Sequence, residues 1–323
     1  MRLCTFEVLT HLGRHQRLGA VTPDGIVDLN FAYASYLGSQ GEPRPHIVAD
    51  ALLPARMLPF LQGGATTMQA AQTALLHAKP GLRGRNEETL IYSLGQVRLR
   101  TPLPNPPSVR DFFAFEQHVK KGFERRGEPM PQEWYEIPVY YQTGHHNIIG
   151  SDEDVLWPSF TQKFDYELEL AAVIGKQGSN VSASDARDYI AGFTIMNDFS
   201  ARDIQRREMK VRLGPAKGKH WCTGLGPHLV TRDDIPDPYN LRMTARVNGE
   251  TWSEGNSGTL FWKFEQMIEF VTQDDTIFPG DVIGSGTVGT GCGLELDRWV
   301  QPGDVMELEI ERLGVLRNRV VKP

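Results

Sequence analysis

The chain has 323 residues, 40% of them hydrophobic, so it can form a sizeable core as one large domain or two ordinary ones. Its formal net charge of -6, without a long block of lysines or arginines, argues against nucleic acid or an anionic membrane as a partner and favours a small molecule. The 3 cysteines are far apart in the sequence and form no CxxC pair, which disfavours both a disulfide framework and a zinc knuckle.

Segments that would direct the chain to a membrane are not expected from the sequence. The first residues contain no apolar signal region with a small-residue cleavage site, and nowhere do about 18 uncharged apolar residues run together. Together with the cysteine pattern, this predicts a cytoplasmic protein without a membrane span.

The first hundred residues begin with three short strand patterns, "CTFEVL", "RLGAV" and "GIVDL", separated by turn residues. Helical patterns follow at residues 31–37 and 57–78, and another strand pattern occurs at "QVRLRTPL". The Pro-rich "TPLPNPP" then interrupts the chain. We therefore predict a small N-terminal domain at residues 1–105 and a larger domain at residues 106–323.

Beyond this boundary the patterns are mostly those of strands, with two predicted helices. The first helix, "FFAFEQHVKKGFERR", places Asp111 at its start and His118 beside an apolar stripe. The second, "SARDIQRREMKVR", opens with Ser200, and Asp203 follows three residues later, which is the arrangement of a capping box.

Between the two predicted helices, "KFDYELELAAVIG" predicts a strand that becomes wholly apolar. Its Asp165, Glu167 and Glu169 share one face, on which successive residues lie about 7 Å apart. Two ionised neighbours would repel by roughly 2 kcal/mol at an effective dielectric of about 20. A divalent cation would compensate these charges, whereas a solvated strand face would need no ion. Taken alone, the stretch slightly favours the solvated face.

Two further aspartates stand where the backbone changes direction. Asp198 follows the apolar strand pattern "GFTIMN", and Asp111 precedes the first helix. For either residue alone, a helix cap or turn is the simpler interpretation. Together with Glu167 and Glu169, however, they could form an all-oxygen site for Mg²⁺, Mn²⁺ or Ca²⁺, since the absence of paired Cys or His disfavours zinc.

His118 has two possible roles. It follows Asp111 by seven residues, two turns of the predicted helix, so it should share the face of Asp111 about 10 Å further along the axis. A histidine beside an apolar stripe is more often a core residue with its hydrogen bonds satisfied. The functional alternative is a general base, because an unperturbed imidazole has a pKa near about 6.5.

Several motifs of other enzyme classes are absent or lack their context. "GSGTVG" satisfies GxGxxG, but a Gly-rich stretch follows it where a dinucleotide-binding unit requires a helix. "GPAKGK" lacks the spacing and the final Ser or Thr of a P-loop. No GxSxG is present, so a serine hydrolase of the nucleophile-elbow type is not indicated.

Residues 108–323 resemble the fumarylacetoacetate hydrolase family. The motifs that carry the resemblance occur in the family's order and are "DFFAFEQH", "IPVYY", "DYELELAAVIG", "MNDFSARDIQ", "LGPAKGK", "GSGTVG" and "LELDRW". The resemblance implies an α+β fold that is mostly β, with a C-terminal mixed β-roll catalytic domain and a smaller N-terminal α+β domain. It also implies a homodimer and a divalent metal ion held by Asp111, Glu167, Glu169 and Asp198. With this resemblance, a bound cation becomes the favoured explanation for the carboxylates of "KFDYELELAAVIG", ahead of a solvated strand face.

The same resemblance implies roles for further residues. His118 matches the base that activates water, and Glu295 matches the carboxylate that orients it. The remaining matches concern substrate contacts, with Lys219 and Gln205 near developing negative charge, Tyr141 and Thr287 at other contacts, and Arg126 or its neighbour Arg125 at a substrate carboxylate. Phe113 and Met209 stand where mammalian fumarylacetoacetases carry tyrosines, which puts fumarylacetoacetate itself in doubt.

The sequence thus predicts a metal-dependent hydrolase that cleaves a carbon-carbon bond in a small dicarbonyl acid of the acylpyruvate or fumarylacetoacetate type. The alternative on the same fold is a metal-dependent isomerase, hydratase or decarboxylase of 2-oxo acids. A third possibility is a non-catalytic metal-binding protein, which would explain the carboxylates but not His118, Glu295 and Lys219.

Overall fold

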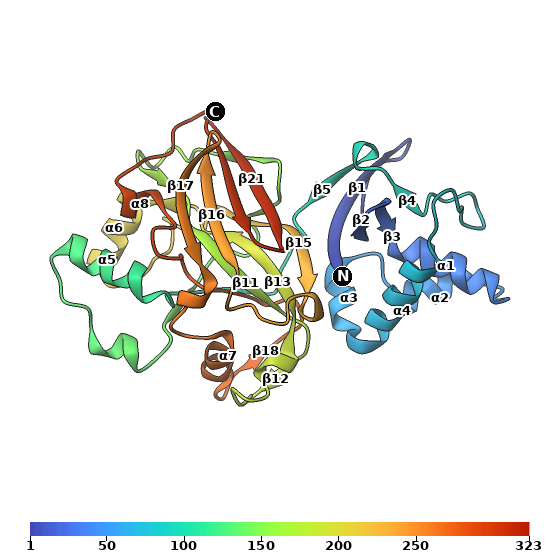
Figure 1. Cartoon of the computed structure of the whole chain (residues 1–323), viewed down its shortest axis with the longest axis horizontal. Coiled ribbons are helices and arrows are strands. Elements are labelled where there is room, and N and C mark those ends of the chain that lie inside the picture. The colour runs from blue at the N-terminus through green and yellow to red at the C-terminus, as the bar shows by residue number, and fades with distance from the viewer. Residues whose placement is uncertain (323) are drawn as a thin grey trace.

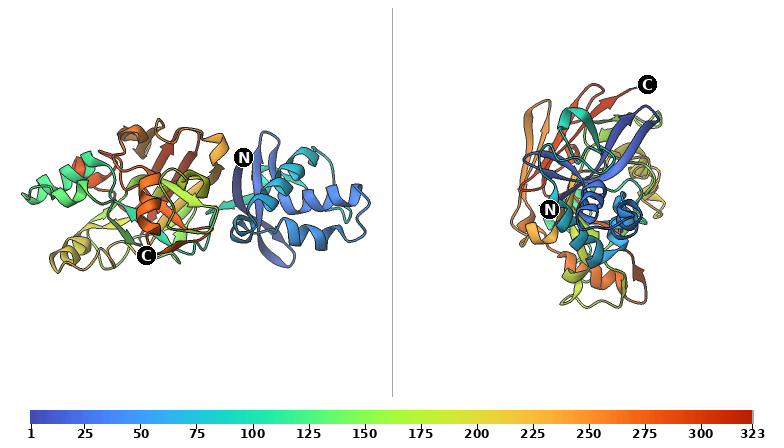
Figure 2. Two further views of the ribbon diagram at one scale, coloured as in Figure 1. Left: turned by 90° about the horizontal axis from the view of Figure 1, so that it is seen from below. Right: turned by 90° about the vertical axis from the view of Figure 1, so that its right-hand side faces the viewer.

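The computed structural model describes residues 1–322 and has two parts that follow the order of the chain (Figure 1). The N-terminal strands and helices lie at one end of the molecule, and the remaining elements form the larger part beside them. A view turned by 90° keeps the two parts side by side along the long axis (Figure 2). Helices and sheets are mixed, with sheets dominant, as the sequence predicts.

The N-terminal part consists of five strands at one end of a long sheet and four α-helices. Its elements are β1 (Arg2–Thr10), β2 (Gly13–Thr22), β3 (Gly25–Asp28), α1 (Leu29–Ser39), α2 (Pro45–Leu52), α3 (Met57–Gln62), α4 (Gly64–His77), β4 (Ile91–Tyr92) and β5 (Val97–Arg100). The helical pattern predicted at residues 57–78 is therefore two helices, α3 and α4, joined at Gly63.

The larger part contains most of the strands. Its first elements are β6 (Val109–Phe112), α5 (Glu116–Arg126), β7 (Tyr140–Gln142), β8 (Ile148–Ile149), β9 (Glu153–Leu156), β10 (Phe164–Asp165), β11 (Leu168–Ile174), β12 (Gly178–Ser179), β13 (Ile190–Asn197) and β14 (Ser200–Ala201). They are followed by α6 (Arg202–Lys210), β15 (Thr223–Thr231), β16 (Arg242–Val247), β17 (Glu250–Asn256), α7 (Phe264–Thr272), β18 (Thr276–Ile277), β19 (Val282–Gly284), α8 (Gly293–Leu296), β20 (Val305–Ile310) and β21 (Gly314–Val321).

Two sheets organise the molecule. The longer one has the order β4-β3-β2-β1-β15-β13-β11-β19-β6-β7, and the five-stranded one has the order β17-β16-β20-β21-β9. The long sheet crosses from the N-terminal part to the larger part where β1 pairs antiparallel with β15. The predicted boundary between residues 105 and 106 stays a prediction.

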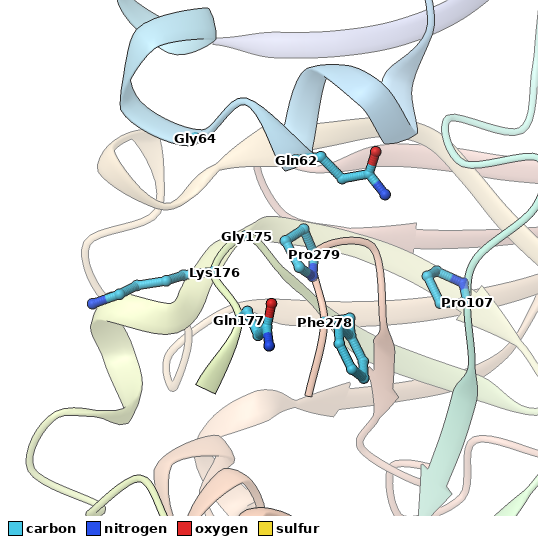
Figure 3. A pocket seen from close by; sticks show the side chains of 8 residues that line it. All are labelled: Gln62, Gly64, Pro107, Gly175, Lys176, Gln177, Phe278 and Pro279. Atoms are coloured by element: carbon cyan, nitrogen blue, oxygen red, sulfur yellow. The ribbon is translucent and has the colours of Figure 1, made fainter. Parts of the chain in front are cut away.

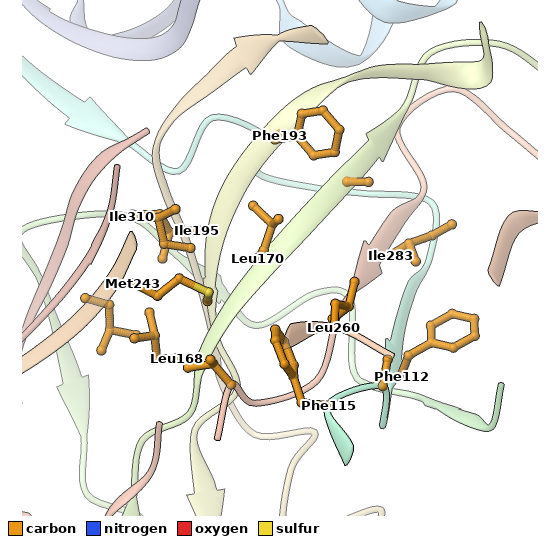
Figure 4. Close-up of a cluster of buried hydrophobic side chains, with 14 of the residues drawn as sticks. Phe112, Phe115, Leu168, Leu170, Phe193, Ile195, Met243, Leu260, Ile283 and Ile310 are labelled. Carbon is orange, nitrogen blue, oxygen red and sulfur yellow. The ribbon is translucent and has the colours of Figure 1, made fainter. Parts of the chain in front are cut away.

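β11 lies between two hydrophobic cores, which explains why its sequence is apolar on both faces. Leu168 and Leu170 point into the larger core together with residues of β13 and of the five-stranded sheet, such as Met243 (Figure 4). Ala171 and Val173 point to the other face, because side chains alternate along a strand. That second core also contains Val109, Met196 and buried residues of α3 and α4.

The helix that carries His118 begins later than the sequence predicts. It starts at Glu116, whereas Asp111 lies in β6, which pairs in parallel with β19 and antiparallel with β7. The expectation that Asp111 and His118 share one helix face is therefore wrong. Pairing on both edges of β6 fixes residues 109–112 as a strand, and this long-range contact overrides the local helical pattern.

The predicted capping box before α6 is also wrong. Ser200 lies in β14, α6 begins at Arg202, and its N-cap residue Ala201 provides no side-chain cap. Asp203 instead accepts hydrogen bonds from the Thr161 hydroxyl and from the Gln162 amide, the latter at 2.9 Å. Its carboxylate therefore ties α6 to the preceding loop.

The sequence predicts neither a dinucleotide-binding helix after "GSGTVG" nor a membrane span, and the lengths of the helices bear on both. The segment after "GSGTVG" enters a turn rather than a long helix, since the next helix is the four-residue α8. Within residues 1–322, helices that are both long and apolar enough to cross a membrane are absent.

Candidate active site

Neighbouring strands of the long sheet bring four carboxylates together. Asp111 lies in β6 and Glu169 lies in β11, on the faces that pack on the second core. Asp198 follows directly after β13. Glu167, two residues before Glu169, contributes the fourth carboxylate. One oxygen from each of the four residues lies within 4.8 Å of the others, and all four residues are buried. The structure thus assembles the predicted ligand set.

Gly284 of β19 makes room for this acidic cluster, which comprises Asp111, Glu167, Glu169 and Asp198. β19 lies between β11 and β6, and Gly284 pairs with Ala171 and with Asp111. A Cβ atom at position 284 would lie 2.9 Å from Asp111 Oδ1 and 3.0 Å from Glu169 Oε2. The two carboxylates therefore occupy space that only a glycine leaves free.

Two buried cations offset part of the negative charge. Lys219 donates hydrogen bonds to Glu167 Oε2 at 2.6 Å and to Asp198 Oδ2. Arg202 Nη2 lies 2.7 Å from Glu167 Oε1. The hydroxyl of Tyr141 donates to Asp198 Oδ2 at 2.5 Å. Lys219 and Tyr141, two predicted site residues, therefore contact the acidic cluster directly.

The pKa values within the cluster shift in opposite directions. Burial raises the pKa of Asp111 and of Glu169 well above the ordinary range, and neighbouring carboxylates add to the effect. Burial also acts to raise the pKa of Glu167, but the positive charges of Lys219 and Arg202 outweigh it and lower the pKa. Burial and the two cations therefore act in opposite directions on the carboxyl groups of the cluster.

The cluster fits a hard divalent cation. Asp111 Oδ1, Glu169 Oε1 and Asp198 Oδ1 are buried and have no hydrogen-bond partner among the described residues. Buried polar atoms are rarely left unpaired, and carboxylate oxygens are the ligands that Mg²⁺, Mn²⁺ and Ca²⁺ prefer. Asp111, Glu167, Glu169 and Asp198 would hold such an ion.

His118 and Glu295 form a buried pair beside the cluster. His118 Nδ1, on α5, contacts Glu295 Oε1, on α8, and Glu295 Oε2 accepts the Thr290 backbone N–H at 2.5 Å. The sulfur of Cys292 lies close to this pair, and Cys292 forms a β-bridge with Glu167. Burial holds the pKa of Cys292 well above its usual value, so the thiol stays neutral. The pair that the resemblance implies is thus present and is linked to the cluster through one backbone bridge.

An open hollow of about 430 Å³ reaches Glu295 of this pair. It lies along α5 and includes Glu295, Thr290 and Gln117 in its lining. A second hollow, of about 540 Å³, lies between α3, the start of α4 and the turn before β19 (Figure 3). Among the described residues that line this second hollow, Lys176 is the one ionisable side chain. We therefore take the hollow at Glu295, rather than the one at Lys176, as the candidate substrate-binding hollow.

The other residues predicted to contact the substrate differ in burial and in hydrogen-bond partners. Thr287 is buried, and its hydroxyl has no partner among the described residues. Gln205 Oε1 accepts a hydrogen bond from Arg202 Nη1 at 3.1 Å. Arg126 is exposed and pairs with Glu128, whereas its neighbour Arg125 lies 3.4 Å from Asp297 at the end of α8. A substrate contact by either arginine stays a prediction.

Sequence reasoning missed Arg202. The sequence pattern assigns it no individual role among the basic residues of "SARDIQRREMKVR", yet it is buried and bridges Glu167 and Asp165. The available signal was its position four residues after Asp198 in "MNDFSARDIQ". This position brings the first residue of α6 close to Asp198, a candidate ligand, so a cation there is a candidate partner for the carboxylates.

Comparison with known sequences supports one family. Residues 108–321 match the family model described as "Fumarylacetoacetate (FAA) hydrolase C-terminal". The human mitochondrial oxaloacetate tautomerase FAHD2A is 34% identical over 331 residues, which cover 99% of this chain and 92% of the relative. The oxaloacetate tautomerase YisK of Bacillus subtilis is 33% identical over 265 residues, which cover 80% of this chain and 84% of the relative.

Solved structures share the fold over its full length. A fumarylacetoacetate hydrolase from Exiguobacterium antarcticum has a TM-score of 0.70 and 23% identity, covering 99% of this chain and 100% of its own. A 5-carboxymethyl-2-hydroxymuconate delta-isomerase from Mycobacterium smegmatis has a TM-score of 0.67 and 23% identity, covering 100% of both chains. At this identity the likeness concerns the fold alone, and the fold hosts hydrolases and isomerases alike.

Proposed function

The chain belongs to the fumarylacetoacetate hydrolase family, and from this premise we propose that it is a divalent-metal-dependent tautomerase of a small 2-oxo dicarboxylic acid such as oxaloacetate. The observation that carries the proposal is the buried pair of His118 and Glu295 beside an all-oxygen carboxylate cluster. The relatives named as oxaloacetate tautomerases, which match most of the chain, favour this isomerase alternative over the hydrolase that the sequence first predicts.

The reaction requires one proton to move within the substrate. Conversion of the keto form to the enol takes a proton from C3 and delivers a proton to the oxygen on C2. His118 accepts the C3 proton at Nε2, while Glu295 holds the proton on Nδ1 and stabilises the imidazolium. The same imidazolium then returns a proton to the C2 oxygen, so the enzyme ends in its starting state.

Positive charge near the C2 oxygen supports this transfer. Asp111, Glu167, Glu169 and Asp198 would hold a divalent ion, which when bound would polarise the 2-oxo acid and acidify C3. Lys219, whose ammonium group reaches the cluster, would donate a hydrogen bond to a developing oxyanion. Thr287 offers a buried hydroxyl for orientation of the substrate.

Two side chains disfavour fumarylacetoacetate as the substrate. Phe113 packs edge-on against His118, with ring centroids 5.3 Å apart, and Met209 is 50% exposed on α6. Neither provides the hydroxyl that a tyrosine at the same position would offer. A small dicarboxylic acid, held by cations and by the metal, does not require these hydroxyl groups.

Carbon-carbon bond hydrolysis is the second candidate, because the pair of His118 and Glu295 also suits it. A histidine oriented by a carboxylate can take a proton from water as well as from carbon. The hydrolysis of an acylpyruvate would use the same His118, Glu295 and Lys219. The predicted homodimer and cytoplasmic location remain part of the proposal.

The direct test follows the enol absorbance of oxaloacetate after the enol form is dissolved in buffer. Metal-loaded protein is expected to accelerate the decay to the keto form, and chelator-stripped protein is expected to lose this effect until Mg²⁺ or Mn²⁺ is added. An unchanged decay rate with metal-loaded, folded protein would contradict the proposal. Acylpyruvates tested in parallel would then reveal a hydrolase.

A further inference from the structure

Asp165 is a fully buried carboxylate whose role neither the metal nor the proposed reaction explains. It precedes Glu167 in the sequence, but it is not one of the four residues of the acidic cluster. Its Oδ1 atom accepts the Gly293 N–H at 2.8 Å, and its Oδ2 atom accepts the Leu294 N–H at 3.0 Å. Arg202 Nε donates to Oδ2 as well, at 2.8 Å. All these donors come from segments that carry proposed site residues.

The two backbone amides belong to the first turn of α8, the element that contains Glu295. α8 is only four residues long, and a single turn is not stable by itself. Its first amides have no partner within the turn, so a side chain must accept them. Asp165 does so for two consecutive residues, Gly293 and Leu294. The turn is also packed tightly, since a Cβ at Gly293 would lie 2.7 Å from Asp165 Oδ1.

The opposite side of Asp165 connects to the acidic cluster. Arg202 Nη2 lies 2.7 Å from Asp165 Oδ2 and also 2.7 Å from Glu167 Oε1. One guanidinium group therefore joins Asp165 to a proposed metal ligand. The connection runs from the turn of Glu295 through Asp165 and Arg202 to Glu167.

We infer that Asp165 is a positioning residue, which holds the α8 turn in register with the carboxylate cluster so that Glu295 stays in contact with His118. The inference rests on the proposed function only in assigning His118 as the base that Glu295 orients. Asp165 does not contact the substrate in this account; it acts through Glu295.

A purely structural role is the competing explanation. Buried ion pairs contribute little net stability in general, because the cost of removing both charges from water offsets their attraction. Loss of Asp165 could nevertheless destabilise the fold without a specific effect on the site. The test therefore needs a matched residue that would have the same structural cost elsewhere.

Asp28 provides this control. It is fully buried, pairs with Arg17 and accepts the Phe31 amide at 3.0 Å as the N-cap of α1, in the N-terminal part. Asp165→Asn and Asp28→Asn therefore remove the same charge from the same kind of setting. Only the first change affects the turn of Glu295.

The first measurement is the low-field proton NMR signal of the His118 Nδ1 proton in its contact with Glu295, assigned by its loss in His118→Gln. The protein is used with its metal and without substrate. The inference predicts that this signal disappears or moves to higher field in Asp165→Asn and is unchanged in Asp28→Asn. An unchanged signal in Asp165→Asn would overturn it.

The second measurement is a double-mutant comparison with Glu295→Gln, using the turnover of oxaloacetate. Asp165→Asn is expected to lower kcat about tenfold or more while KM changes less than about threefold. In the Glu295→Gln background the same change is expected to have little further effect, because both substitutions disable one unit. Fully additive losses would overturn the inference.

The two readouts separate this inference from the proposed function. If the protein does not turn over oxaloacetate, the NMR comparison still decides the role of Asp165. If Asp165→Asn yields no folded protein, Asp165→Ser is tested, since serine still accepts one backbone N–H. Failure of both variants to fold, with Asp28→Asn folded, would overturn the inference in favour of a structural role.

Discussion

His118 is the residue on which the proposed chemistry depends most directly. It is a buried residue of α5 that faces the turn of α8, and its Nδ1 contacts a carboxylate while Phe113 packs against its ring. A carboxylate partner fixes the tautomer, which leaves Nε2 free to accept a proton. Nothing in this arrangement requires His118 to be a metal ligand.

Substitution of His118 should separate catalysis from metal binding. His118→Gln is expected to lower kcat by about 10²- to 10⁴-fold, the usual contribution of a general base. Mn²⁺ affinity, measured by calorimetry, should stay within a few-fold of the wild-type value. His15→Gln, on the exposed face of β2, is the control and should leave both quantities unchanged. A His118→Gln enzyme with full activity would exclude this base.

At the residue scale, the sequence indicates the carboxylates of the acidic cluster more clearly than the basic side chain of Arg202 that pairs with them. Each of the four carboxylates has a simpler interpretation alone, but together their strand positions and spacing indicate a possible all-oxygen site. Arg202 lies in a helix rich in arginine and lysine, where one buried cation looks like its solvated neighbours. Its burial depends on where α6 begins, which the sequence placed two residues too early.

At the scale of elements, β19 is essential for the acidic cluster although it contributes no ligand. It separates β11 from β6, and Gly284 lies beside the side chains that the two strands contribute. The acidic cluster therefore depends on the absence of a side chain at position 284 of β19. A feature of this kind cannot be recognised until the pairing of the strands is known.

Gly284→Ala should impair metal binding. The new Cβ would lie 2.9 Å from Asp111 Oδ1, 3.0 Å from Glu169 Oε2 and 2.4 Å from Met196 Cε, so the carboxylates must move. We expect Mn²⁺ affinity to fall by about tenfold or more, as when groups that orient metal ligands are lost. Gly95→Ala is the control, because its Cβ would meet no described atom within 4 Å. Equal affinities in the two variants would contradict this account of the site.

The position of Asp111 shows the limit of local patterns at this scale. The residues from Phe112 onward read as one helix, and on that basis Asp111 was expected at the helix start. Pairing with β19 and β7 holds residues 109–112 in a strand instead. The partner strands are distant in sequence, so local periodicity could not reveal the competition. Asp111 nevertheless lies with the other three carboxylates, as both the carboxylate pattern and the resemblance predict.

At the scale of the whole molecule, β15 joins the two parts by pairing with β1. It contains His228, whose pKa depends in part on a residue of β1. His228 is partly buried near Arg2 of β1. Burial, with the nearby charge of Arg2, lowers the pKa of His228 to about 4. In the unfolded chain the pKa is near about 6.5, so between these values the unfolded state binds the proton more readily.

The stability of the protein should therefore decrease in acid through His228. Its contribution is complete above about pH 6.5 and is lost as the pH falls toward 4, for a total of about 3 kcal/mol. In urea unfolding at a series of pH values, His228→Gln should show a shallower decrease over this range. His11→Gln, exposed between β1 and β2, should retain the wild-type slope. An unchanged slope in His228→Gln would contradict the assignment.

The overall architecture was predictable from the resemblance, but the connection between the two parts was not. The motifs at residues 108–323 identify the larger part and its strands. The pairing of β1 with β15 makes one sheet of both parts, and the first residues carry no motif that would reveal this partner. Register between distant strands is set by the shared core, which contains Leu3 from β1 and Leu229 from β15.

The most direct test of the central claim is to identify the products that form from oxaloacetate by carbon-13 NMR, with metal-loaded wild-type protein and with chelator-stripped protein. The account predicts faster interconversion of the keto and enol forms with metal and no new carbon compound. Metal-dependent formation of oxalate and acetate, or of pyruvate and carbon dioxide, at a rate above that of interconversion would contradict it.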